Sequence, residues 1–164
     1  ETIAELMETE IGQVSSTSIR NALAEGRPSD AAKQLGHWHR IEGVVIGGEQ
    51  RGRELGYPTA NMSLDDLHLP HLGVYAVLVD VLNGEHVGSY NGVASLGVRP
   101  MFGENAPNLE TFIFDFSGDL YGATLSVALV DFMRPEIKFD SLEKLIVQMD
   151  QDSLKAKELL KSLK

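Results

Sequence analysis

Strand-like runs of hydrophobic residues dominate the middle of the chain. Four runs rich in Val, Leu, Phe and Tyr occupy residues 73–82, 87–97, 109–116 and 123–133, and a further extended segment begins at residue 37. Short turn sequences such as NGE, GEN and SGD separate the later runs. Such runs joined by hairpin-length connections predict antiparallel strands. We expect five or six strands that close into a barrel, because closure removes exposed sheet edges.

The run at 109–116 combines a carboxylate with an aromatic face. Period-2 alternation puts Glu110 on the same side as Phe112, Phe114 and Phe116. A carboxylate beside apolar side chains needs a partner or a task, and such surroundings can raise its pKa toward that of a useful base. The alternative is a strand-end glutamate that simply faces water. The pattern alone leaves both interpretations open.

Helical patterns occur on both sides of the strand region. Near the start, Ser15 to Thr17 can cap a short helix that Gly26 and Pro28 end. A second short helix then begins at a Ser29 cap and ends at Gly36.

The chain from Asp140 to its end predicts one long helix. Asp140 with Glu143 three residues later resembles a capping box. The apolar stripe of this helix consists of Leu142, Leu145, Ile146, Met149, Ala156, Leu160 and Leu163. Helical spacing of these residues predicts packing against the barrel, with no need for a cofactor.

Composition narrows the classes of function. The 164 residues are 43% hydrophobic, which suffices for one compact domain, and the formal net charge is −10. Between Val74 and Met133 the sequence has one basic residue, Arg99, so we expect no nucleic-acid partner. No apolar run is long enough to span a bilayer, and no signal-peptide pattern is present, so we expect no membrane partner. The absence of cysteine fits a reducing compartment, and we expect a cytoplasmic protein.

The loop "GRELGYPTAN" at residues 52–61 is the strongest local candidate for a site. Gly52 and Gly56 lack Cβ, so their backbone amides can approach a ligand closely, and Pro58 stiffens the exit from the loop. Thr59 and Asn61 are two apart on an extended segment, so their side chains point the same way. Both offer neutral oxygens, which suit a Mg²⁺ ion that arrives bound to nucleotide phosphates. The alternative is an ordinary turn in which these residues hydrogen-bond their own backbone.

Several motifs in order resemble the riboflavin kinase family. "RGRELGYPTAN" is similar to that family's signature loop, and "YNGVASLGVRPMFG", "LETFIFDF" and "FMRPEIKFDSLEKLIVQMDQD" follow it. Upstream, "VSSTSIRNALAEG" resembles the end of the nucleotidyltransferase module of bacterial bifunctional riboflavin kinase/FMN adenylyltransferases (FAD synthetases). The resemblance implies that residues 1–36 are a remnant of that module and residues 37–164 are a six-stranded kinase barrel with a C-terminal helix.

The resemblance also implies an activity and its residues. The activity is transfer of the γ-phosphate of ATP to the 5′-hydroxyl of riboflavin, giving FMN and ADP with Mg²⁺ as cofactor. Glu110 would be the catalytic base, while Thr59 and Asn61 would hold the metal, and Arg134 together with Asn61 would lie near the flavin. The implied nucleotide-binding residues are Gly52, Arg53, Gly56, Pro58, Ser95 and Gly97.

The sequence departs from the family's pattern in two places. Met101 stands where the family usually has threonine, within the segment that includes Arg99. No His-x-Gly-His phosphate motif is present, and His37 and His39 do not supply one, so we interpret them as histidines at the entry of the first strand.

Without that motif, the residues that would help bind ATP in a complete transferase module, Ser16, Thr17 and Arg20, lack the rest of their site. We therefore expect this chain to be unable to make FAD from FMN. The adenylyltransferase module is expected as an N-terminal partner in the full-length protein.

Three competing hypotheses remain. A non-catalytic flavin- or nucleotide-binding sensor barrel would have lost at least one of Glu110, Thr59 and Asn61, and all three are present. An oligonucleotide-binding barrel would need a basic, aromatic face. A kinase that uses a phosphate donor other than ATP stays within the same class, because the sequence does not fix base specificity.

Overall fold

The computed structural model describes residues 8–9, 12–13, 16–46, 59–64, 69–101, 104–116, 118–137 and 139–162. Its helices are α2 (Ser16–Ala24), α3 (Pro28–Leu35) and α5 (Leu142–Lys161). Its strands are β1 (Glu8–Thr9), β2 (Gly12–Gln13), β3 (His39–Val44), β4 (Ala60–Ser63), β5 (Gly73–Val81), β6 (Gly88–Met101), β7 (Glu104–Ile113) and β8 (Thr124–Arg134). Among the described helices, none is both long and apolar enough to cross a bilayer.

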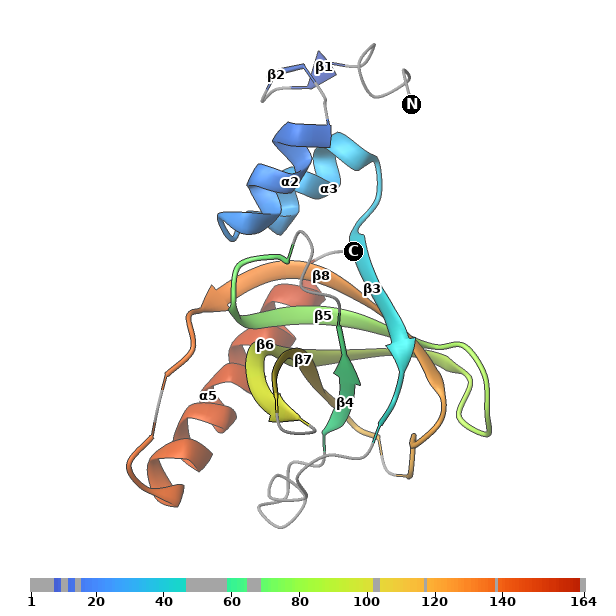
Figure 1. Ribbon diagram of the computed structural model, residues 1–164, viewed down its shortest axis with the longest axis vertical. Helices are drawn as coiled ribbons and strands as arrows, with labels where there is room; N and C mark the ends of the chain where they lie inside the picture. Colours follow the sequence, from blue (N-terminus) through green and yellow to red (C-terminus); the bar gives the residue numbers. More distant parts are fainter. Residues whose placement is uncertain are drawn as a thin grey trace.

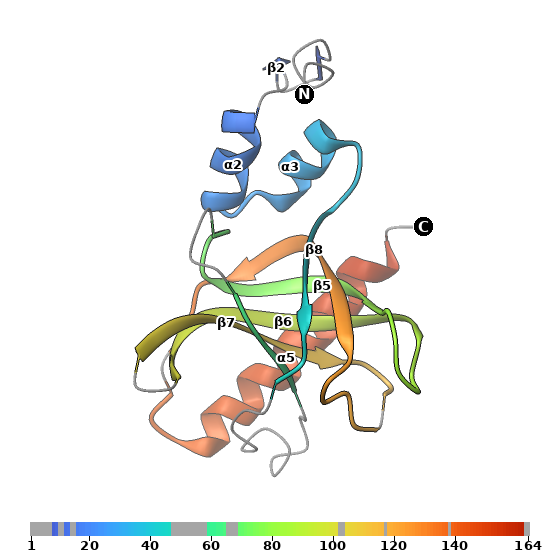
Figure 2. The same cartoon turned by 45° about the vertical axis from the view of Figure 1, so that its right-hand side comes forward.

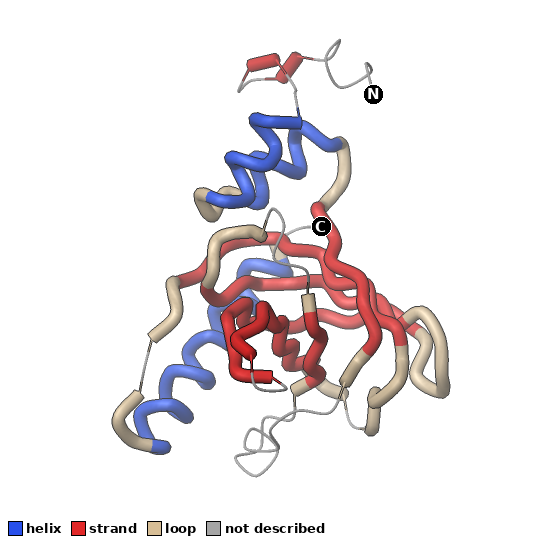
Figure 3. The backbone as a smooth tube through the Cα atoms, viewed as in Figure 1, coloured by secondary structure: helices blue, strands red, loops and turns tan. Residues whose placement is uncertain are grey.

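Six antiparallel strands form one curled sheet in the order β3-β8-β5-β6-β7-β4 (Figure 1). Figure 3 shows these strands bending round a common interior, with the helices outside them. The two edge strands approach each other at one isolated bridge, where the Ile46 amide donates to the Asn61 carbonyl over 2.8 Å. The described residues therefore show a mainly β fold with a curled, open sheet. Continuous pairing of β3 with β4, which would close it into a barrel, stays a prediction.

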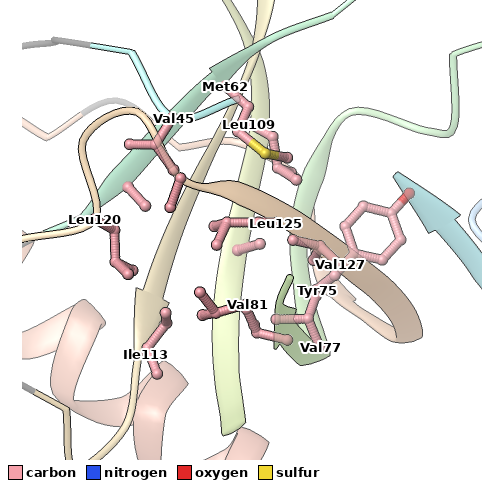
Figure 4. Packing of buried hydrophobic residues seen from close by; sticks show 14 of the residues in the cluster. Val45, Met62, Tyr75, Val77, Val81, Leu109, Ile113, Leu120, Leu125 and Val127 are labelled. Atoms are coloured by element: carbon pink, nitrogen blue, oxygen red, sulfur yellow. The ribbon is translucent and has the colours of Figure 1, made fainter. Parts of the chain in front are cut away.

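The concave side of the sheet is filled by alternate residues of the strands. Tyr75, Leu109 and Leu125 are fully buried there (Figure 4). Leu96 is fully buried in the same cluster. Burying one such side chain contributes about 1.5 to 3 kcal/mol, so this cluster accounts for a large part of the driving force for folding. Burial raises the pKa of the Tyr75 phenol, whose hydroxyl donates to the His71 carbonyl oxygen.

The opposite face of the sheet packs against α5, which contacts β5, β6 and β8 (Figure 2). Ala156 and Leu160 of the helix cluster there with Ala76, Phe114 and Val130. This packing confirms that the C-terminal helix covers the sheet. The helix does not cover the whole of that face, so the uncovered residues there can form a site.

The start of α5 differs from the expected one by one residue. Ser141, not Asp140, is the N-cap, and its hydroxyl accepts a hydrogen bond from the Lys144 amide over 3.2 Å. Asp140 instead pairs with the Lys144 side chain at 3.1 Å.

The predicted apolar stripe of α5 is buried in the second half of the helix and only partly buried in the first, where Leu145, Ile146 and Met149 are half-buried. Leu142 is 44% exposed, because the first turns extend past the sheet. The buried face runs through Asp152, Ser153, Ala156 and Leu160. Leu163 lies outside the described residues.

The two N-terminal helices form a separate layer above the sheet (Figure 1). Ala22, Leu23 and Ala31 pack together in a small cluster of their own. Gly36 ends α3 in the left-handed conformation, as expected, with φ 82°. The expected Ser29 cap is wrong: Arg27 is the N-cap without a side-chain hydrogen bond, because Pro28 occupies the first helical turn. The His71 amide connects this layer to the segment before β5 by donating to the Leu23 carbonyl over 2.8 Å.

The aromatic run after Glu110 ends earlier than its alternation predicts. Strand β7 stops at Ile113, and the turn that follows includes Asp115 with φ 55°. This turn carries Phe116 away from Phe112 and Phe114, and its ring lies 5.1 Å from that of His86 and 5.3 Å from that of Tyr90. Of the three phenylalanines, Phe112 and Phe114 share the face of Glu110 and Phe116 does not.

Candidate active site

Glu110 lies on the face of the sheet that looks away from the buried core. Its strand neighbours Leu109 and Thr111 are buried on the core side, whereas Phe112 packs in the cluster beneath α5. Glu110 is half-buried, so it is neither fully solvated nor sealed in the interior. The sequence-based alternative of a strand-end residue in open water does not describe this position.

Strand β4 brings the predicted metal ligands to Glu110. Asn61 is the direct cross-strand partner of Glu110. The Thr59 hydroxyl donates to the Glu110 carboxylate, with 3.4 Å between Oγ1 and Oε2, a long and therefore weak hydrogen bond. Register and hydrogen bonding together place the three side chains on one face, as alternation along the two strands predicts.

Strand β6 flanks Glu110 on the other side. Ser95 is its cross-strand partner there, and Gly97 follows on the same face. A Cβ built on Gly97 would lie 2.0 Å from the Oε1 of Glu136, so the carboxylate of Glu136 rests against the bare backbone at this glycine. The sequence indicated Gly97 but gave no sign that the segment after β8 reaches it.

Asn61 is 6% exposed and makes a side-chain contact that the sequence analysis missed. The amide nitrogen of Asn108 donates to its Oδ1 over 3.2 Å. Asn108 lies two residues before Glu110 on the same face of β7 and is 1% exposed. Alternation puts Asn108 on the same face as Glu110, but only the cross-strand register shows its contact with Asn61.

The oxygens on this face suit a hard divalent cation. Thr59 and Asn61 supply a hydroxyl and an amide oxygen beside the Glu110 carboxylate. Within the described residues, no group of three or more His, Cys, Asp or Glu side chains is placed to hold a metal ion. Because the Thr59 and Asn61 oxygens are neutral, they suit a Mg²⁺ ion that is already bound to nucleotide phosphates. The residues present therefore fit the expected cofactor.

Arg134 is held in an ion pair that the sequence did not indicate. Its Nη2 lies 2.6 Å from the Oδ2 of Asp152 on α5, and its Nε donates to both oxygens of the same carboxylate at 3.0 and 3.1 Å. The side chains are 17% and 9% exposed. Gln148 also donates to Asp152, over 2.9 Å. A charged residue on the buried face of a helix was the available sign of this pairing.

A surface cavity of about 580 Å³ adjoins this ion pair. It lies between the segment after β8 and the first turns of α5, and Gln148 belongs both to its lining and to the Asp152 network. The lining residues are Ile137, Phe139, Asp140, Glu143, Lys144, Val147 and Gln148. The cavity thus combines apolar and charged groups next to Arg134.

The remaining predicted residues divide into two groups. Gly52, Arg53, Gly56 and Pro58 lie outside the described residues. Arg99 and Met101 are on β6, where the structure describes the backbone and not their side chains.

The histidines and the N-terminal polar residues lie outside β4, β6 and β7, in α2 and around the start of β3. His39 is half-buried as the first residue of β3, and burial, followed by the proximity of His37, lowers its pKa. His37 is exposed and precedes β3 by two residues, so both histidines lie at the entry of that strand, as expected. Ser16, Thr17 and Arg20 belong to α2, in the N-terminal helical layer.

Comparison with known proteins shows one consistent family. The family model for riboflavin kinase (Flavokinase) matches residues 35–160. The bifunctional riboflavin kinase/FMN adenylyltransferase of Listeria monocytogenes is 41% identical over 142 residues, covering 85% of this chain and 44% of that protein. The Bacillus subtilis protein of the same name is 38% identical over 159 residues, covering 94% and 49%. The chain spans about half the length of the curated relatives that it matches.

Solved structures agree on the fold. A crystal structure described as a macrolide-efflux protein from Streptococcus pneumoniae has a TM-score of 0.79 and 39% identity, covering 89% of this chain and 47% of that chain. The riboflavin kinase from Trypanosoma brucei has a TM-score of 0.54 and 24% identity, covering 76% and 80%. At that identity the second likeness shows the fold alone.

Proposed function

This chain belongs to the riboflavin kinase family, and we propose that it transfers the γ-phosphate of ATP to the 5′-hydroxyl of riboflavin on the face that carries Glu110. The observation that carries the proposal is the meeting of Thr59, Asn61 and Glu110 across β4 and β7. A base and two oxygen ligands held close together are what phosphoryl transfer requires of a protein.

The reaction assigns one role to each of these side chains. The bond between the riboflavin 5′-oxygen and the γ-phosphorus forms while the bond from that phosphorus to the β,γ-bridging oxygen breaks, and ADP leaves. The proton of the 5′-hydroxyl passes to the Glu110 carboxylate as the new bond develops. Thr59 and Asn61 would hold the nucleotide's Mg²⁺, which would neutralise part of the phosphate charge. The backbone of Ser95 and Gly97 forms the wall of the same site.

The flavin site lies beside Arg134 in this proposal. The adjoining cavity offers the apolar side chains of Ile137, Phe139 and Val147, which suit a flat aromatic ring system. Arg134 is positioned rather than free, because Asp152 fixes its guanidinium through Nε and Nη2. The sheet register links this region to the proposed base, because Arg134 pairs with Val74, Val74 with Ser95, and Ser95 with Glu110. The ribityl chain would therefore run across β5 and β6 toward the metal.

Closure of the barrel belongs to the same proposal. Asn61 is the residue at which the edge strands meet, because its backbone oxygen accepts from the Ile46 amide while its side chain faces Glu110. A seam that closes further along β3 and β4 would hold a metal ligand more rigidly. Hydrogen exchange of the amides of β4, with and without nucleotide, tests this point.

The N-terminal residues and the larger protein are the remaining part of the proposal. Residues 1–36 would be the end of a nucleotidyltransferase module, and residues 37–164 the kinase, a division that agrees with a family match beginning at residue 35. In the full-length protein the preceding module would convert FMN to FAD, and this chain alone would not. A cytoplasmic location stays a prediction, which fractionation of the host cell would test.

The proposed activity is tested by incubating the chain with riboflavin, ATP and Mg²⁺ and separating the flavins by chromatography. We expect FMN, formed when metal is present and not when EDTA removes it, and no FAD. Tight flavin binding by fluorescence quenching without any FMN would favour the sensor-barrel alternative. Formation of FAD would contradict the expectation that this chain cannot convert FMN to FAD.

A further inference from the structure

Asn108 is a buried polar residue that the proposed reaction does not yet use. It lies on β7 two residues before Glu110, and it is 1% exposed. Its Nδ2 donates to the Oδ1 of Asn61 over 3.2 Å. Its own Oδ1 is shielded from solvent and has no hydrogen-bond partner among the residues that the structure describes.

The surroundings of Asn108 do not explain why an amide is present there. Its cross-strand partner on β6 is Gly97, which has no side chain, and its partner on β4 is Ser63, which is exposed. An orphaned buried acceptor costs free energy, whereas an apolar side chain of similar shape at the same place would not. The interaction that Asn108 does make leads to one side chain, Asn61.

We propose that Asn108 is a positioning residue for the metal site, an inference that rests on the proposed function. An asparagine amide can present either its oxygen or its nitrogen, and Mg²⁺ binds the oxygen. The donor on Asn108 selects the orientation of Asn61 by engaging one acceptor position of its Oδ1. A carbonyl oxygen has a second acceptor position, which remains for the cation.

The orphaned Oδ1 of Asn108 has a matching role. Mg²⁺ keeps several of its waters when it binds to proteins, and such waters donate hydrogen bonds to nearby oxygens. The Asn108 oxygen is an acceptor two residues from Glu110 on the same face and is not used by any described side chain. One amide therefore both orients a metal ligand and accepts from the metal's hydration shell.

The test compares the binding of ADP with and without Mg²⁺ by isothermal titration calorimetry, so that it does not depend on turnover. In Asn108→Leu, we expect Mg-ADP to bind about tenfold more weakly or worse, the usual size of a loss around a metal ligand. Binding of metal-free ADP and of riboflavin should stay unchanged. Asn108→Ser, whose hydroxyl can still donate to Asn61, should keep the metal dependence to within about threefold. If Asn108→Leu does not fold, Asn108→Ala takes its place.

Leu109→Val is the matched control, because it weakens the core on the same strand and leaves the amide pair intact. It should lower the melting temperature and leave the metal dependence unchanged. If Mg²⁺ strengthens ADP binding by the same factor in wild type and in Asn108→Leu, the inference is wrong and the proposed function stands. An equal loss with and without metal would also overturn the inference. If wild type itself binds ADP equally with and without Mg²⁺, the metal assignment of the proposed function fails with it.

Discussion

Replacing Asp152 with alanine should destabilise the protein through the charge that it leaves behind. Asp152 receives three hydrogen bonds from the guanidinium of Arg134, the shortest at 2.6 Å, and one from Gln148 at 2.9 Å. The variant keeps the helix and the strand but removes the carboxylate that pairs with Arg134. The Arg134 side chain is only 17% exposed, so its charge is left largely buried.

The size of the effect follows from that exposure. Removing one partner of a fully buried ion pair costs about 3 to 5 kcal/mol, whereas exposed pairs contribute about 0 to 1 kcal/mol. Since water reaches one side of Arg134, we expect Asp152→Ala to lower the free energy of unfolding by about 2 to 3 kcal/mol. For a chain of this size, that corresponds to a fall in melting temperature on the order of 5 to 10 °C.

Urea denaturation followed by circular dichroism measures this loss. The control is the double variant Arg134→Met with Asp152→Leu, which removes both charges and should lie within about 1 kcal/mol of wild type. If the single and the double variant are equally unstable, the cost comes from packing and not from an uncompensated charge. A loss below about 0.5 kcal/mol in Asp152→Ala would show that solvent already screens the pair.

Four further predictions concern the site and its surroundings. Glu110→Gln should lower kcat by about a hundredfold or more, as loss of a general base does, while riboflavin affinity from fluorescence titration stays the same; equal turnover would remove Glu110 from the mechanism. Thr59→Ala should weaken Mg-ADP binding in calorimetry, and an unchanged affinity would disprove its metal role. Gly97→Ala should cost under about 1 kcal/mol in urea, because the new Cβ meets the flexible end of Glu136, and this cost should disappear in a Glu136→Ala background. Because burial lowers the pKa of His39, the unfolded chain takes up its proton first, so the contribution of His39 to stability should be constant above about pH 6.5 and fall on acidification. His39→Gln should therefore make the melting temperature fall less steeply below that pH, and an unchanged slope would contradict this prediction.

The strands were predictable because alternation and turn residues are local signals. Runs at 73–82 and 123–133 became β5 and β8 with shifts of one residue. Phe116 was misplaced because the positive φ of Asp115 ends the alternation, and no glycine marks that turn. The first turns of α5 were predicted as buried because helical spacing does not show how far the sheet extends beneath them.

Within the candidate site, the sequence predicts which residues of one strand share a face. It does not predict which residues of different segments come into contact. Thr59 and Asn61 could be paired by spacing, and Glu110 stood out on an aromatic face. Asn108 and Glu136 went unnoticed because their contacts, to Asn61 and to the backbone at Gly97, join residues far apart in the chain. Cross-strand register and the path of the segment after β8 are needed to find them, and these are properties of the fold.

The central claim is that phosphoryl transfer takes place where β4 meets β7. A crystal structure of the chain with riboflavin, ADP and Mn²⁺ tests it most directly, because the anomalous signal of Mn²⁺ locates the metal. We expect the metal peak at the oxygens of Thr59 and Asn61, with the flavin 5′-hydroxyl within hydrogen-bonding distance of the Glu110 carboxylate. A metal peak away from β4, or a 5′-hydroxyl that faces a different side chain, would contradict it.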